Sequence, residues 1–149
     1  MAVMNVAKFE RFFRLAASLD VDKGDLRRYN DFIDQQIYDL LLIGQAHAKT
    51  HDHVLIWPSD LPITKGLQES IHAFRGIDEQ IDLLPILEGL TKHPPMDLDY
   101  NDETKAELPE IAGGMSVALA RSFKLIVPGI KNPTTPDWER AFEVFNLLL

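Results

Sequence analysis

Apolar residues recur every three or four positions along most of this chain, which is the spacing of amphipathic helices. From Met4 to Ala17 this spacing predicts a short helix, whose apolar side carries Phe9, Phe12, Phe13 and Ala16. A turn-like run follows, and from Asp25 to about His51 the apolar positions continue at helical period. That second helix would have about 27 residues and a length of roughly 40 Å. Because isolated helices are marginal in water, other elements must pack along much of it.

A brief interruption separates this helix from the next one. Val54-Leu-Ile-Trp57 is typical of a short extended run, and Pro58 closes it. We expect Ser59 or Asp60 to cap the following helix. Its core face is made by Leu61, Leu67, Ile71 and Phe74.

The second half of the chain, from near Ile77, has the same order of elements. A short helix is expected from about Leu84 to Lys92, with Pro85 at its first position. Asn101 is expected to cap a second long helix that ends near Val127. The pattern predicts an all-α chain.

Two features weaken the second long helix, and a proline-rich connection follows it. Pro109 lies in its interior and removes a hydrogen bond, while Gly113-Gly114 is interpreted as the point where the two long helices cross closely. The last helix is expected to begin at a cap, Thr134 or Thr135, followed by Pro136 and an apolar face through Trp138, Phe142, Phe145 and Leu148.

The two halves align with each other at an offset of 77 residues. Leu19-Asp-Val-Asp22 falls on Met96-Asp-Leu-Asp99, Asp60 falls on Asp137, and each half places 40 residues between these landmarks. A fixed period indicates a repeated supersecondary unit. We therefore expect residues 1–149 to form one compact domain from two units, 1–76 and 77–149, because one unit alone cannot cover the apolar stripe of its long helix.

The order of elements in each half resembles the histone fold. It consists of a short helix, a loop, a long helix, a short extended run and, in the first half, a Pro-x-Asp-Leu segment before the last helix. Asp60, in Trp57-Pro-Ser-Asp-Leu61, stands where histones carry an aspartate at the start of their third helix. The tandem arrangement resembles bacterial proteins in which two histone folds are fused as an internal pseudodimer. The resemblance covers essentially the whole chain, and it implies structural roles for Asp60 and Asp137. It also implies a monomer, because the pairing surface is satisfied within one chain.

Composition and charge exclude several classes of protein. Hydrophobic residues make up 46% and charged residues 26% of the chain, as in ordinary globular proteins. There are no cysteines, so disulfide frameworks and thiol catalysis are excluded. With no membrane-length apolar run and no signal-peptide pattern, a cytoplasmic location is expected.

Charge also argues against nucleic-acid binding. The formal net charge is −8, and residues 77–149 hold six Lys and Arg against 13 Asp and Glu. The positions where the second loop of histones carries Arg, Lys and Thr hold His53, Val54 and Leu55 here. If the units pair antiparallel, one end would still gather four basic residues, and these are the candidate DNA contacts: Lys23, Arg27, Arg28 and Lys131. The alternative is a solvated helix start, which the interleaved aspartates favour.

The histidines near residue 50 are the remaining chemical candidates. His47, His51 and His53 have spacings that can hold zinc, but nothing in the sequence directs His53 to the same point, so frayed histidines are favoured and no metal site is predicted. Antiparallel pairing would place His51 and His53 near Asp97, Asp99 and Asp102, as a pH-responsive end. The two tryptophans, Trp57 and Trp138, belong to the core or to an exposed partner patch.

No catalytic motif or cofactor fingerprint is recognisable, so the sequence predicts a protein that is not an enzyme and carries no cofactor. The function expected is a protein-interaction module of the heterodimerisation type or a scaffold, with an unidentified partner. Weak architectural DNA binding through Lys23, Arg27, Arg28 and Lys131 is the alternative.

Overall fold

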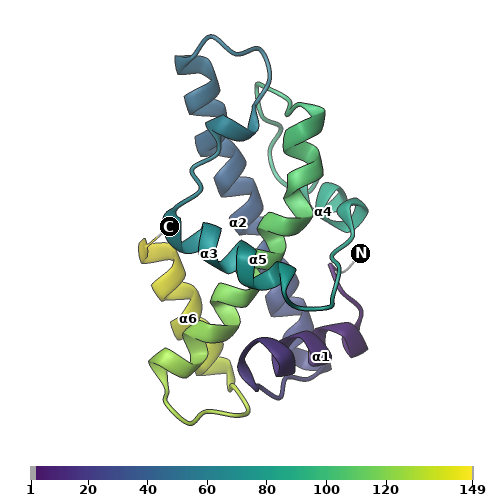
Figure 1. Ribbon diagram of the computed structural model, residues 1–149, viewed down its shortest axis with the longest axis vertical. Helices are drawn as coiled ribbons and strands as arrows, with labels where there is room; N and C mark the ends of the chain where they lie inside the picture. Colours follow the sequence, from purple (N-terminus) through teal and green to yellow (C-terminus); the bar gives the residue numbers. More distant parts are fainter. Residues whose placement is uncertain (1–2, 149) are drawn as a thin grey trace.

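A computed structural model describes residues 3–148, which form six α-helices and one short 3-10 turn (Figure 1). The helices are α1 (Val6–Ala17), α2 (Lys23–Thr50), α3 (Lys65–Arg75), α4 (Leu83–Leu90), α5 (Asp102–Ile126) and α6 (Thr135–Leu148), and the 3-10 turn is η1 (Pro58–Asp60). The predicted all-α class and the two long helices are confirmed.

Capping residues fix where the long helices begin. Asp22 accepts hydrogen bonds from the backbone of Gly24 and Asp25, and Asp25 reaches back to the Asp22 N–H, so that α2 starts with a reciprocal capping box. Asn101 caps α5, as predicted, by accepting a hydrogen bond from the Thr104 N–H at 2.9 Å.

The predicted start of the third helix is wrong. Asp60 ends the short η1 turn, and α3 begins only at Lys65, where Thr64 accepts a hydrogen bond from the Leu67 N–H at 3.1 Å. Pro62 explains the break, because a residue before proline avoids helical geometry and Leu61 is extended (ψ 135°). In the second half, α4 begins at Leu83, so Pro85 lies two residues inside it.

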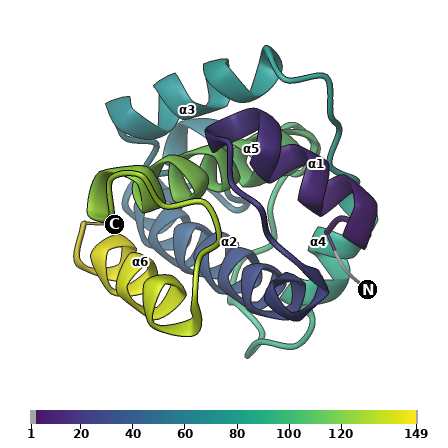
Figure 2. The same ribbon diagram turned by 90° about the horizontal axis from the view of Figure 1, so that it is seen from below.

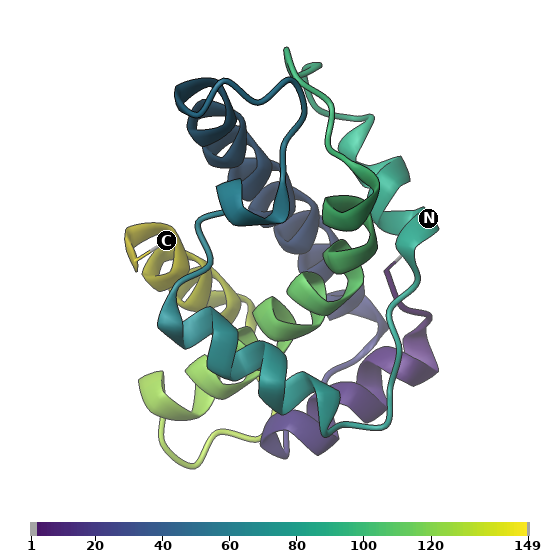
Figure 3. The ribbon, with the colours of Figure 1, turned by 45° about the horizontal axis from the view of Figure 1, so that its top comes forward.

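The long helices α2 and α5 cross near the middle of the molecule, with α1 and α6 at one end (Figures 1 and 3). A buried hydrogen bond of 2.6 Å joins Tyr29 of α2 to Ser116 of α5 at this crossing. Burial of the phenol raises the pKa of Tyr29, although the bond to Ser116 lowers it in part. The hydroxyl therefore stays protonated and the link neutral.

Aromatic side chains fill the core on the α1 side of this crossing. Phe9 and Phe13 pack on Tyr29 with ring centroids 5.1 and 5.6 Å apart, respectively. Trp138 of α6 is fully buried and meets the edge of Phe123 at 4.8 Å. Trp138 therefore belongs to the core and cannot be part of an exposed partner patch. Trp57, which is 47% exposed, still can.

The glycine pair in α5 faces α3 rather than α2, which corrects its interpretation as a crossing point of the long helices. A Cβ on Gly113 would lie 2.5 Å from the ring of Phe74, and one on Gly114 would lie 3.0 Å from the backbone nitrogen of Ile71. A Cβ on Gly114 would also lie 2.5 Å from Ile71 Cγ1, and real Cβ atoms essentially never approach other atoms as closely as 2.5 Å; α3 packs directly against α5 (Figure 2). The missing side chains therefore let the first half's third helix approach the second half's long helix.

Within the described range 3–148, none of the helices combines the length and apolar character needed to cross a membrane.

Candidate functional site

The loop that follows α2 pairs with the segment that precedes α5, and this junction positions the candidate site. Ile56 donates its N–H to the Asp99 carbonyl at 2.8 Å and accepts from the Asn101 N–H at 3.1 Å, in a parallel bridge with Tyr100. The buried Thr104 hydroxyl also donates to the Ile56 carbonyl, at 2.8 Å. The loop is therefore held on one side by the second half of the chain.

A related junction lies at the other end of the molecule, between the segment before α2 and the loop after α5. There the Asp20 N–H donates to the Lys131 carbonyl at 2.7 Å. At the repeat offset of 77, Pro133 is the counterpart of Ile56. Proline has no N–H to donate, so Pro133 cannot form the donor half of the bridge that Ile56 makes.

Asp60 and Asp137, which are 77 positions apart in the sequence, make the same backbone contact. The carboxylate Oδ2 of each accepts the N–H of the residue three positions earlier, Trp57 and Thr134, at 2.8 Å in both cases. Their burial differs, because Asp60 is fully buried and Asp137 is only partly covered. The two ends therefore share one local hydrogen bond, which is buried at Asp60 and solvent-accessible at Asp137.

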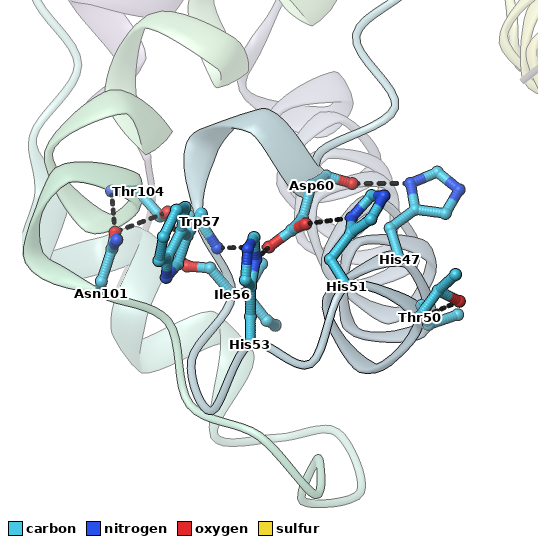
Figure 4. A network of polar contacts seen from close by, with 10 residues as sticks. His47, Thr50, His51, His53, Ile56, Trp57, Asp60, Asn101 and Thr104 are labelled. Atoms are coloured by element: carbon cyan, nitrogen blue, oxygen red, sulfur yellow. Dashed lines mark hydrogen bonds and ion pairs between the residues drawn. The ribbon is translucent and has the colours of Figure 1, made fainter.

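Three imidazoles surround Asp60 (Figure 4). His53 Nδ1 lies 2.8 Å from Oδ2 of Asp60, and His51 Nδ1 lies 3.3 Å from Oδ1. His47, one turn earlier on α2, places its Nδ1 2.8 Å from the Asp60 backbone carbonyl. Nearly every acceptor of Asp60 thus faces a polar partner.

The surroundings of Asp60 hold it as a carboxylate. Burial acts to raise its pKa, but hydrogen bonds from His53, the Trp57 N–H and His51 outweigh burial, so the pKa lies below its ordinary value. The Trp57 indole stacks on the His53 ring with centroids 3.7 Å apart and planes at 16°. This stacking fixes the orientation of His53 toward the carboxylate.

The sequence predicted that His51 and His53 lie beside aspartates of the second half. The predicted carboxylate partners are wrong. Their carboxylate is Asp60, from the same half, while Asp97 pairs instead with Lys49 at 2.5 Å. His51 and Asp60 are only nine positions apart in the sequence. The loop between them has to turn back at Pro58 before their side chains can meet.

The four basic residues predicted as DNA contacts do share one end. The Asp20–Lys131 contact brings the loop after α5 to the start of α2, where Lys23 and Arg27 are exposed and Arg28 is half-buried. Acidic groups share that surface, because Asp20, Asp22 and Asp25 lie on the same segment. The end is mixed in charge rather than basic.

An apolar groove lies between α2, α3, α5 and α6. It consists of two adjacent cavities of about 240 and 170 Å³ that share Thr64, Leu67 and Leu148. Phe145 lines the first cavity, and Ile43, which is 45% exposed, lines the second.

Comparison with known proteins places the chain in a family. Residues 9–146 match the domain of unknown function DUF1931, and the chain belongs to that family. A crystal structure from Thermus thermophilus is 49% identical, with 99% of each chain covered and a TM-score of 0.94. A crystal structure from Aquifex aeolicus has the same fold at 22% identity, covering 96% of this chain and 94% of its own, with a TM-score of 0.81. An Aquifex aeolicus protein described as uncharacterized is 24% identical over 117 residues, which are 78% of this chain and 68% of that protein.

Proposed function

We propose that the chain is a pair of histone-like units fused in one polypeptide and that it serves as a protein-interaction module. The crossing of α2 and α5 supports the pairing, as do the loop contacts at both ends and the matched contacts of Asp60 and Asp137. His53 also supports the resemblance. It stands seven residues before Asp60, where histones carry arginine, and it contacts the aspartate carboxylate in that position.

The apolar groove carries the interaction part of the proposal. Its lining is mainly apolar, and two of its residues, Ile43 and Leu148, are 45% and 74% exposed. Grooves between helices take the apolar face of an amphipathic helix from another protein. Asp39 lies in the groove lining and the chain has a net charge of −8, so the favoured occupant is a partner helix whose polar face is basic.

Affinity recovery from the cytosol of the source organism tests this proposal. We expect a protein that binds the wild-type chain and is lost with Ile43→Asp, because a charge would enter the groove without a partner. Leu125→Asp is the matched control, since Leu125 is 83% exposed on α5 and does not line the groove. The control should recover the same protein, and cross-links from it should map to the groove.

Two results would contradict the interaction proposal. One is equal recovery by Ile43→Asp and wild type. The other is self-association of the purified chain through this groove, detected by light scattering and abolished by Ile43→Asp, because the occupant would then be a second copy.

The contact between Asp20 and Lys131 favours a second candidate, weak DNA binding at the mixed-charge end. We expect duplex DNA to bind at low salt at most and to be released at physiological salt, because each neutralised phosphate adds about 0.9 to the slope of log affinity against log salt. Fluorescence anisotropy with labelled duplex measures this. Lys131→Glu should abolish the low-salt binding, while Lys92→Glu, the same charge change two residues after the end of α4, should leave most of it. Binding that persists at physiological salt would favour the DNA function.

A further inference from the structure

The Asp60 cluster brings together three metal-binding side chains from the end of α2, from the loop after it and from η1. His51 is the C-terminal cap of α2, His53 lies in the following loop, and Asp60 ends η1. One ligand atom from each lies within 4.8 Å of the others. We propose that His51, His53 and Asp60 bind a divalent transition metal of the zinc class, with the fourth position open to water.

The distances suit such an ion. Ligands at 2.0–2.1 Å from a tetrahedral zinc ion are about 3.3 Å apart. His51 Nδ1 and Asp60 Oδ1 already have that separation, 3.3 Å. His53 Nδ1 lies 2.8 Å from the other carboxylate oxygen, Oδ2, so a small turn of the ring or of the carboxylate has to bring His53 Nδ1 to the same separation from Oδ1 as the metal replaces the proton between them. The side chain of His51 is 61% exposed, so its ring is free to adjust and solvent reaches the fourth position.

Supporting groups around the three ligands have the arrangement that metal sites use. The Trp57 N–H donates to Asp60 Oδ2 at 2.8 Å and fixes the carboxylate plane. The Trp57 ring stacks on His53, and His47 contacts the Asp60 carbonyl at 2.8 Å, which ties η1 to α2. Groups of this kind hold ligands in place and increase metal affinity.

The second half of the chain supplies an internal comparison. Asp137 makes the same backbone contact as Asp60, yet the positions that match His51 and His53 hold Pro128 and Ile130. The turn before the last helix of a unit therefore forms without imidazoles. The two histidines are an addition at one end, and their nitrogen atoms with one carboxylate are a donor set suited to zinc and its neighbours in the transition series.

Zinc titration of the tag-free, chelator-treated full chain tests the proposal by calorimetry and by tryptophan fluorescence. We expect one zinc ion per chain at micromolar affinity, and a fluorescence change that Trp57→Phe removes, since Trp57 stacks on a ligand. His51→Ala and His53→Ala should each weaken binding by more than about tenfold. His72→Ala, which removes an exposed histidine of α3, is the matched control and should bind as wild type does.

His51→Ala decides the outcome, because its exposed side chain can be removed without opening the core, and an unchanged thermal melt verifies the fold. Unchanged affinity in that variant would overturn the site. So would an equal loss in His72→Ala, or no saturable binding by the wild-type chain. None of the three proposed ligands lines the groove, so the partner-recovery experiment can fail or succeed independently of this one.

Discussion

Residues 1–76 and residues 77–149, produced as separate chains, should each remain largely unfolded, and an equimolar mixture should fold. The physical reason is that α5 of the second half packs against α1, α2 and α3 of the first half. The Tyr29–Ser116 hydrogen bond also crosses between the halves and is fully buried. Each fragment alone would expose these surfaces to water.

The contacts between α3 and α5 account for much of the stability that each half loses on separation. Phe74 is 6% exposed in the folded chain and lies against Gly113, so separation uncovers both the ring and the apolar surface of α5. Burying one such side chain contributes about 1.5–3 kcal/mol, and whole-protein stability is only about 5–15 kcal/mol. A few uncovered core residues therefore suffice to unfold either half.

Circular dichroism and thermal melting measure this prediction, with the equimolar mixture and the intact chain as controls. The mixture should recover a cooperative melt whose midpoint rises with protein concentration, because folding is then bimolecular. If either fragment melts cooperatively as a compact monomer, the two-unit interpretation of the chain is wrong.

The sequence predicted the long helices well, because their signals are local. Apolar spacing marks α2 and α5, and the cap of α5 at Asn101 follows from side-chain chemistry that acts within one turn. The repeat offset of 77 also matched Asp60 to Asp137, and these two residues do make the same contact three positions back.

Contacts between distant segments could not be predicted in the same way. Gly113 indicates a close approach by its missing Cβ, but the helix that approaches, α3, is set by the tertiary fold. The candidate site depends on the loop after α2 turning back at Pro58 so that Asp60 meets His51 and His53. The three residues lie within ten positions of the sequence, but the directions of their side chains depend on the turn at Pro58.

Replacing Asp60 by alanine should destabilise the chain far more than replacing Asp137, although both remove the same backbone contact. At Asp60 the buried carboxylate also accepts from His53 and His51, so its loss leaves the Trp57 N–H and the mostly covered His53 without their acceptor, while the exposed His51 can bind water instead. Hydrogen bonds to charged groups contribute about 1.5–3 kcal/mol each, with incomplete additivity, so we expect a loss of about 3 kcal/mol. Asp137→Ala removes contacts to the N–H and the hydroxyl of Thr134 at the exposed start of α6, and losing a capping interaction of this kind typically costs about 1 kcal/mol.

Urea unfolding and thermal melting of both variants in the presence of a chelator measure this difference, since the chelator excludes any contribution from bound metal. At about 2–4 °C per kcal/mol for a chain of this size, Asp60→Ala should lower the Tm by roughly 6–12 °C and Asp137→Ala by roughly 2–4 °C. Equal losses would mean that the imidazoles add nothing to the backbone contact of Asp60 with Trp57. In the expected case, the His–Asp cluster stabilises its end of the molecule before any metal binds. A bound ion would then raise the Tm of the wild-type chain further but not that of His51→Ala, since binding to the folded state alone shifts the equilibrium toward it.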